Sequence, residues 1–162
     1  MLNEMTDNKL AKPRPLEKVV LYSGISFLAY YGYYKWMIQD ELRRYDGKSW
    51  SGAKCLIPFI VGVLFPQILW RLDPDVDPWF GWFSLLGLAW IYYAQFRLYR
   101  TVNQMYRDEG WDEPLTIWWM LIPGINILVG FRQIHYLSEY WAKKQGLKTS
   151  DRLGKYIASI RI

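Results

Sequence analysis

The chain has little of the chemistry from which active sites are usually built. Among its 162 residues there is one cysteine and one histidine. Because Cys55 is alone, a disulfide within the chain and a multi-cysteine metal site are both excluded. Because His135 is alone, so is a two-histidine metalloprotease site. A phosphate-binding loop ending at residues 47–49 would need glycine at position 42, where the chain has Leu42. No nucleophile, base or metal constellation is visible, so we expect a protein that is not an enzyme.

Basic residues are missing from one long stretch. Of the 20 Lys and Arg residues, only Arg71 lies between positions 55 and 96. This stretch has two apolar arms, 55–72 and 79–96, joined by an acidic, proline-containing connector at 73–78. Each arm approaches the roughly 20 residues that a helix needs to cross a bilayer, and in lipid such segments satisfy their backbone groups only as helices. The stretch therefore predicts a hairpin of two transmembrane helices.

Aromatic residues are abundant, at 19% of the chain with 10 Trp and 13 Tyr. Trp and Tyr favour the membrane interface because one end of each side chain is apolar and the other polar. The net charge of +5 suits contact with anionic headgroups, so we expect membrane lipids as partners. The aromatics belong to apolar runs and match no nucleic-acid-binding module, so we expect no nucleic-acid partner.

Four apolar segments organise the chain, at 19–38, 55–72, 79–96 and 115–131. We predict an all-α integral membrane bundle over 19–146, with a polar tail at 1–18 before it and an amphipathic helix at 147–162 after it. The first segment has no small-residue cleavage site, so we expect it to be retained.

Three charged stretches that follow apolar segments end in glycine, at Gly47, Gly110 and Gly146. Basic residues followed by glycine are typical of a helix C-terminus, because glycine accepts the left-handed cap and cations suit the negative end of the helix dipole. The helices should therefore continue beyond the membrane.

The chain shows signs of an internal repeat. Residues 56–58 followed by Gly62 recur as residues 121–123 followed by Gly130, and Gly47 and Gly110 are separated by a similar offset. The pattern predicts two copies of one unit, about 19–72 and 79–131, in a pseudo-two-fold arrangement. The alternative is chance similarity between membrane segments of low sequence diversity.

Two topologies remain open because the first and fourth segments either span the membrane or are partly inserted. If all four span, the basic residues divide between both faces; if only the hairpin spans, nearly all of them lie together. We favour the hairpin, with both termini and most basic residues on the cytoplasmic-equivalent side of a bacterial inner or thylakoid-type membrane.

The C-terminal stretch predicts a short helix with Ser150 as its N-cap. One face carries apolar residues and basic residues surround it. The apolar residues are Leu153, Tyr156, Ile157 and Ile160. The helix would either lie on the membrane or dock onto a partner, and a frayed tail is the third possibility.

His135 directly follows an apolar helix, where an imidazole can bind a tetrapyrrole metal or titrate near neutral pH. The alternative is an interfacial histidine that is hydrogen-bonded to protein, lipid or water. Asp73, Asp75 and Asp77 offer oxygen ligands for Ca²⁺ or Mg²⁺, but the prolines around them indicate a rigid exposed turn, so we expect no bound metal. Bound lipid or pigment is the cofactor class that this composition suggests.

Gln67 and Asn126 interrupt apolar segments. In hydrocarbon such groups must find polar partners, so both are predicted to make helix-to-helix contacts. Lys35 and Gln95 lie nearer the segment edges.

Two stretches resemble a known family. Residues 32–47 (GYYKWMIQDELRRYDG) and 121–141 (LIPGINILVGFRQIHYLSEYW) are similar to the bacterial membrane proteins of domain-of-unknown-function family 4234. The resemblance implies a small helical membrane protein and brings no catalytic residue with it. The chain departs from the family in its connector at 73–78 and in its aromatic content.

These observations lead to one functional hypothesis and one alternative. We expect a non-enzymatic accessory or assembly subunit of a larger membrane complex of respiratory or photosynthetic type, in contact with other membrane subunits. The reason is that proline-broken apolar segments and isolated polar residues need neighbours that a chain of 162 residues cannot supply. The alternative is a small transporter or lipid-handling protein in which the repeats flank a site at the midplane.

Overall fold

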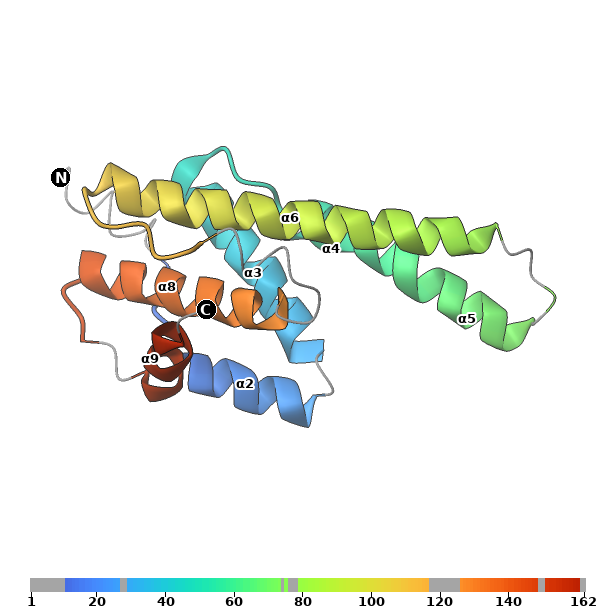
Figure 1. Ribbon diagram of the computed structural model, residues 1–162, viewed down its shortest axis with the longest axis horizontal. Coiled ribbons are helices and arrows are strands. Elements are labelled where there is room, and N and C mark those ends of the chain that lie inside the picture. The colour runs from blue at the N-terminus through green and yellow to red at the C-terminus, as the bar shows by residue number, and fades with distance from the viewer. Residues whose placement is uncertain are drawn as a thin grey trace. The chain divides into compact units, whose positions relative to one another are not determined.

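The computed structural model describes residues 11–26, 29–73, 75, 79–116, 126–148 and 151–160. Every regular element in these ranges is a helix (Figure 1), which confirms the all-helical prediction for the described part of the chain. The elements are α2 (Leu16–Ile25), α3 (Ala29–Asp46), α4 (Gly52–Phe59), the π-helical turn η1 (Ile60–Leu64), α5 (Phe65–Leu72), α6 (Phe80–Asp108), α8 (Asn126–Lys144) and α9 (Arg152–Ser159).

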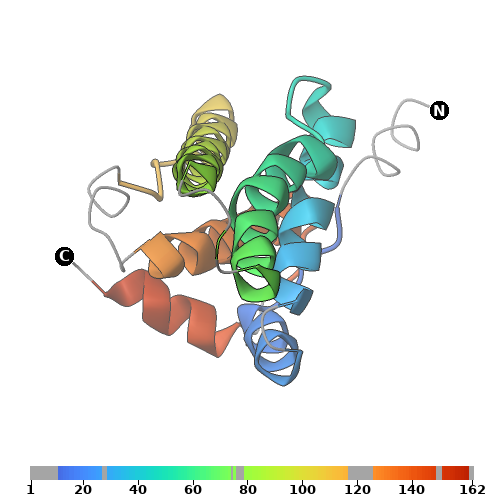
Figure 2. The same ribbon diagram turned by 90° about the vertical axis from the view of Figure 1, so that its right-hand side faces the viewer.

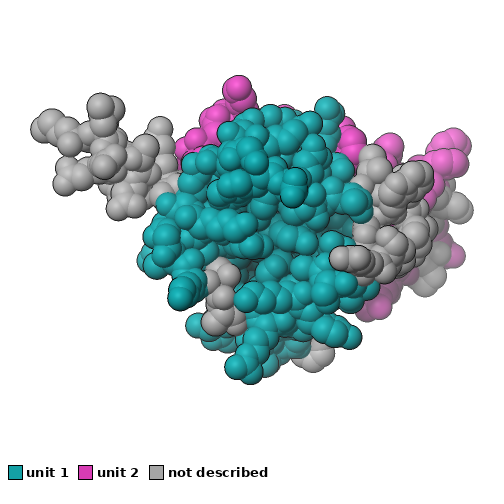
Figure 3. All heavy atoms as spheres, turned by 60° about the vertical axis from the view of Figure 1, so that its left-hand side comes forward, with its two compact units in different colours: residues 1–34, 97–162 teal, residues 35–96 magenta. Residues whose placement is uncertain are grey.

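The chain forms two compact units. Unit 1 comprises residues 1–34 and 97–162, and unit 2 comprises residues 35–96, as coloured in Figure 3. Both α3 and α6 begin in one unit and end in the other.

The first apolar segment, 19–38, is two helices where the sequence predicted one. α2 ends at Ile25 and α3 begins at Ala29. The Ser26 hydroxyl donates to the Tyr22 carbonyl at 2.7 Å and accepts the Tyr30 N–H at 2.9 Å. One serine therefore satisfies a carbonyl at the end of α2 and an N–H at the start of α3, a use of short polar side chains that competes with continuous helix.

Glycine ends α3, α6 and α8, as predicted. Gly47, Gly110 and Gly146 have φ of 67°, 72° and 64°, in the left-handed region that favours glycine. After α6, the Trp111 N–H bonds to the Tyr106 carbonyl and the Gly110 N–H to the Arg107 carbonyl, each at 2.9 Å, which is the bonding pattern of a Schellman motif. The cap prediction is confirmed, and all three helices extend beyond their apolar segments.

Unit 2 contains the two arms of the predicted hairpin. α4, η1 and α5 form one helical run, Gly52–Leu72, of 21 residues. Among the described residues it is the one helix long and apolar enough to cross a membrane. The second arm, α6, has more Trp and Tyr, whose polar tips make it less apolar on average. Residues 74 and 76–78 of the connector lie outside the described residues.

The backbones of the two arms come into close contact at a pair of glycines. A Cβ added at Gly62 would lie 2.7 Å from the Gly87 Cα and 2.8 Å from the Phe83 carbonyl oxygen. A Cβ added at Gly87 would lie 3.0 Å from the Gly62 Cα. Close backbone contact through small residues is typical of helix pairs in membranes.

The core of unit 1 is centred on α8. This helix lies between the C-terminal part of α6 on one side and α2 and α9 on the other (Figure 1 and Figure 2). Its side chains Trp141, Tyr140 and Ile134 are almost completely buried. From α6, the Tyr106 hydroxyl donates to the Tyr136 carbonyl at 2.8 Å, which joins the two helices by a polar bond within an aromatic core.

Asn103 of α6 holds the segment that follows its own helix. Its side-chain amide donates to the Leu115 carbonyl at 2.9 Å and accepts the Leu115 N–H at 3.2 Å, and it is buried. Residues 117–125, most of the fourth apolar segment predicted at 115–131, lie outside the described residues. The possible repeat, whose second copy includes them, stays a prediction.

The C-terminal helix α9 packs against α8 and α2 of its own chain. Its N-cap is Asp151, whose carboxylate accepts the Gly154 N–H at 2.9 Å. The predicted cap, Ser150, lies outside the described residues. Ile157 is buried, whereas Tyr156 of the predicted apolar face is 68% exposed. The apolar face of α9 is thus used mainly within the protein.

Candidate functional site

The hairpin turns its large apolar side chains outward. We call these residues the hairpin surface: Ile57, Ile60, Val61, Leu64, Phe65, Ile68, Leu72, Trp79, Trp82, Phe83, Leu85, Leu86, Leu88, Tyr92 and Tyr93. The buried positions of the hairpin are small or compact instead, namely Gly52, Cys55, Gly62, Pro66, Gly87 and Ala94. Soluble monomers rarely expose so large an apolar area, and such surfaces are typical of sites that contact lipid or another protein.

Trp90 links the two arms through a backbone carbonyl. In a regular helix the N–H of residue 58 would bond to the Lys54 carbonyl, but Pro58 has no N–H. The Trp90 Nε1 donates to this carbonyl at 3.0 Å. A backbone group freed by proline needs such a partner in lipid. This pairing has no signature in the sequence, because Pro58 and Trp90 lie far apart along the chain.

Trp90 also belongs to an aromatic cluster beside the start of the first arm. Its ring stacks on Trp50 at a centroid distance of 5.1 Å and an interplanar angle of 18°. The Tyr93 ring lies 5.5 Å from Trp50, and the Lys54 Nζ lies 4.5 Å from the centroid of Trp50. Stacked aromatic rings beside a cation are typical of the boundary between lipid and water.

The polar residues predicted within the apolar segments have different surroundings. Lys35 is buried, and its Nζ donates to the Gln95 Oε1 at 3.2 Å. Gln67 is exposed on α5, and the side chain of Asn126 lies outside the described residues. Helix contacts of Gln67 and Asn126 therefore stay predictions. In unit 2, Gly62 and Gly87 form the close contact between the arms; the sequence marks Gly62 only as part of the possible repeat and does not predict this contact.

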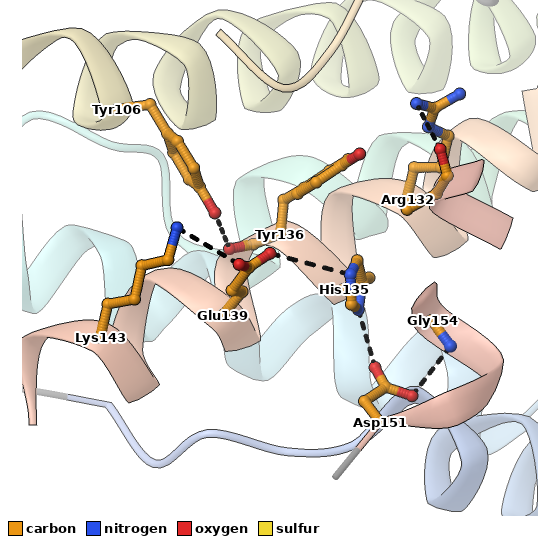
Figure 4. Close-up of polar contacts among 9 residues, drawn as sticks. Tyr106, Arg132, His135, Tyr136, Glu139, Lys143, Asp151 and Gly154 are labelled. Atoms are coloured by element: carbon orange, nitrogen blue, oxygen red, sulfur yellow. Dashed lines mark hydrogen bonds and ion pairs between the residues drawn. The ribbon is translucent and has the colours of Figure 1, made fainter. Parts of the chain in front are cut away.

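His135 lies in a polar cluster in unit 1 (Figure 4). It is 4% exposed; its Nδ1 is 2.9 Å from the Asp151 Oδ2 and its Nε2 is 3.8 Å from the Glu139 Oε2. Gly154 packs directly on the imidazole, and a Cβ at this position would collide with the His135 Nδ1 and with the Asp151 carboxylate. The cluster thus joins α8 to the first turn of α9.

The charge on Asp151 is stabilised by its hydrogen bonds. Burial alone disfavours a charged carboxylate. The hydrogen bonds from His135 and from the backbone N–H groups of Gly154 and Leu16 outweigh that effect, so the pKa of Asp151 lies below its ordinary value. The other end of α9 is held by Arg132 of α8, whose guanidinium donates to the Ala158 and Ile160 carbonyls, each at 3.4 Å.

Glu139 connects the histidine to a more exposed cation. The Lys143 Nζ is 3.2 Å from the Glu139 Oε1 and 4.8 Å from the centroid of the Trp111 ring. Tyr106 lies beside this pair (Figure 4), and burial raises the pKa of its hydroxyl well above the ordinary value. A tyrosine that stays protonated acts as a hydrogen-bond donor, which is its role toward the Tyr136 carbonyl.

This geometry favours a structural role for His135. Both ring nitrogens face carboxylates, and a tetrapyrrole metal would need the Nε2 to turn away from Glu139. The tetrapyrrole ligand stays a prediction that requires this rearrangement. In the connector, the Asp75 N–H donates to the Asp73 Oδ1 at 3.1 Å, as in an Asx turn, and Asp77 lies outside the described residues. No group of three potential metal ligands occurs in the described part of the chain.

No family model, curated protein or solved structure matches the chain. The resemblance to domain-of-unknown-function family 4234 therefore stays a prediction from residues 32–47 and 121–141.

Proposed function

We propose that the hairpin inserts into a membrane and that the protein is a non-enzymatic accessory or assembly subunit of a larger membrane complex, of respiratory or photosynthetic type. The exposed hairpin surface carries this proposal. Each large apolar side chain left in water forfeits about 1.5–3 kcal/mol relative to burial. Burying the hairpin surface in lipid would therefore contribute a large favourable free energy that the chain alone does not gain.

The proposed orientation follows from charge. The connector between the arms contains Asp73 and Asp75 and no Lys or Arg, whereas almost all basic residues lie outside the hairpin. The connector would face the far side of a bacterial inner or thylakoid-type membrane, with both termini on the cytoplasmic-equivalent side.

Gln67 supports a role as a subunit. It is exposed on an arm whose neighbouring exposed residues include Leu64 and Ile68. An amide that faces hydrocarbon without a partner costs several kcal/mol by transfer estimates, of order 4–8, so a neighbouring polypeptide is its expected partner.

Extraction and native electrophoresis test the two parts of the proposal separately. Alkaline carbonate should leave the protein in the membrane pellet, and release into the soluble fraction would refute insertion. After mild-detergent extraction, the untagged protein should migrate in an assembly larger than its own oligomers. Migration only as a monomer or small homo-oligomer would count against the subunit role and favour the transporter or lipid-handling alternative.

A matched pair of variants connects this result to Gln67. Gln67→Leu should reduce co-migration with the larger assembly, because it removes the amide that the partner would bind. Gln104→Leu makes the same chemical change at an exposed position of α6 in unit 1 and should have no effect. An equal reduction in both variants would show that Gln67 is not part of the contact.

Cysteine labelling tests the topology. Reporters replacing Val76, Asn8 and Lys148 in a Cys55→Ala background are probed with an impermeant thiol reagent. If Val76 labels apart from the other two, the hairpin topology is supported, and if all three label together, four spans are selected. If Asn8 labels apart from Lys148, both topologies fail, because the number of crossings between them is then odd.

A further inference from the structure

Unit 1 has an apolar helix side that its own core does not use. α2 buries Leu16, Val19 and Ser23. Its opposite side exposes the large residues Leu21 (60%), Tyr22 (47%) and Ile25 (69%). An amphipathic helix of a water-soluble domain would have polar residues on that side.

α9 contributes basic residues to the same outer surface. Both α2 and α9 lie on one side of α8 and contact each other (Figure 1 and Figure 2). Because α9 buries Gly154 and Ile157, its exposed side carries Arg152, Lys155 and Tyr156. The buried sides of α2 and α9 pack toward α8, so the exposed sides of both helices face away from α8.

The net charge of this surface is positive. Lys18 of α2 is exposed together with Arg152 and Lys155 of α9. The acid among them, Glu17, already accepts hydrogen bonds from the Arg152 and Leu153 N–H groups, at 3.0 Å and 3.1 Å, and so serves the N-terminus of α9. Cations beside exposed apolar residues complement the phosphates and the outer acyl region of an anionic bilayer.

We propose that the outer sides of α2 and α9, here called the α2–α9 surface, bind the headgroup region of a membrane that contains anionic phospholipid. The basic side chains contact phosphates, and Leu21 and Ile25 enter the interface beside them. This contact does not require the hairpin to insert, so it extends beyond the proposed function. It also reverses the role predicted for α9 from sequence, because the basic side of the helix, and not its apolar side, faces the lipid.

The test uses the full chain with an environment-sensitive dye on Ser159→Cys in a Cys55→Ala background. Ser159 is exposed on α9. The protein is reconstituted in nanodiscs of phosphatidylcholine with increasing phosphatidylglycerol. Dye emission should shift to the blue as phosphatidylglycerol increases, and should stay unchanged in phosphatidylcholine alone.

Two pairs of substitutions assign the contact. Arg152→Gln with Lys155→Gln should weaken it about 25-fold, since each charge contributes about fivefold near the surface. Arg100→Gln with Arg107→Gln removes the same charge from exposed positions of α6. This control pair should leave the membrane contact of the α2–α9 surface unchanged. Leu21→Gln with Ile25→Gln should weaken contact without changing its dependence on anionic lipid.

Each outcome separates this inference from the hairpin proposal. If the protein enters the discs and the dye does not respond to phosphatidylglycerol, or if both charge pairs weaken the contact equally, the inference is overturned while insertion stands. If the protein does not enter discs but floats with phosphatidylglycerol vesicles in a manner that depends on Arg152 and Lys155, the inference stands and insertion fails.

Discussion

Unit 1 buries its large apolar and aromatic side chains, whereas the hairpin of unit 2 exposes residues of the same kinds. Unit 1 buries its largest side chains, among them Trp141 and Tyr140, and exposes large apolar ones mainly on α2 and near α9. The hairpin buries Gly62 and Gly87 and exposes leucine, isoleucine and aromatic rings along both arms.

The difference shows that hydrophobic content alone does not identify the environment of a segment. In water, helices gain most by burying large apolar side chains. In lipid that gain disappears, so helices associate through close backbone packing and hydrogen bonds instead. The packing of unit 1 has the pattern expected in water, and the Gly62–Gly87 contact and the bond from Trp90 to the Lys54 carbonyl have the pattern expected in lipid.

The largest expected effect is confined to unit 1. His135→Ala removes one hydrogen-bond partner of the buried Asp151 carboxylate, and leaving a buried charged group without such a partner costs about 3 kcal/mol or more. We expect α9 to detach, measured as protease cleavage and hydrogen exchange in residues 151–160. Lys143→Ala removes a half-exposed partner of Glu139 and should cost under about 1 kcal/mol. Comparable loss in both variants would contradict the assigned role of His135.

Acid should loosen the same helix. The pKa of Asp151 is lower in the folded protein than its ordinary value of about 3.9. Its contribution to stability is therefore complete above the ordinary pKa and is lost as the pH falls through the folded pKa. Hydrogen-exchange protection in α9, relative to the intrinsic exchange rate at each pH, should stay constant from pH 7 to about pH 5 and fall below about pH 4. The Asp151→Asn variant should lose this acid dependence, and detachment of α9 already between pH 7 and 5 would contradict the assignment.

A lysine introduced at an exposed leucine of each unit tests whether the two surfaces lie in different environments. Leu64 of the hairpin and Leu147 of unit 1 are about equally exposed, at 49% and 54%. Leu64→Lys should reduce membrane insertion by about 2.5–3.5 kcal/mol if the hairpin lies in lipid. Leu147→Lys should change stability by no more than about 0.5 kcal/mol. Carbonate extraction measures how much of each variant stays in the membrane pellet. If neither substitution changes this fraction, the hairpin surface does not face lipid.

Glycine substitution tests the packing rule of the hairpin. Gly62→Ala places a methyl group against the backbone of the opposite arm, and we expect a loss of about 1–3 kcal/mol. At Gly81 the same methyl would lie 3.5 Å from the Trp70 ring, in ordinary contact, so Gly81→Ala should be neutral or slightly stabilising. Thermal unfolding in detergent provides the measurement. If Gly62→Ala causes no loss of stability, the backbones of the two arms are further apart than the Gly62–Gly87 contact requires.

The helix ends and the hairpin arms could be predicted because their signals are local. A basic turn before Gly47, Gly110 or Gly146 needs no knowledge of distant residues, and neither does an apolar run of about 18 residues. The break between α2 and α3 was missed because Ser26 reads as one polar residue in an apolar run, although its hydroxyl serves both helices.

The site residues were harder to predict because their roles depend on distant partners. His135 was identified as unusual, but neither its contact with Asp151 nor the close packing of Gly154 has a sequence signature. Gln67 and Asn126 were chosen by polarity, whereas the observed contact between the arms uses residues without a side chain, Gly62 and Gly87. Polarity indicates which groups need partners, and it does not reveal where two backbones meet.

The smallest expected effect concerns the hydrogen bond between the arms. Trp90→Phe keeps an aromatic ring on Trp50 but removes the donor to the Lys54 carbonyl, and one such bond contributes about 1 kcal/mol. In a Pro58→Ala background, residue 58 regains an N–H that can bond to that carbonyl along the helix. Trp90→Phe should then cost markedly less, and a double-mutant cycle from thermal unfolding in detergent should give a coupling of about 0.5–1 kcal/mol. Equal costs of Trp90→Phe in both backgrounds would show that the indole acts through stacking alone, and the polar link between the arms would have to be discarded.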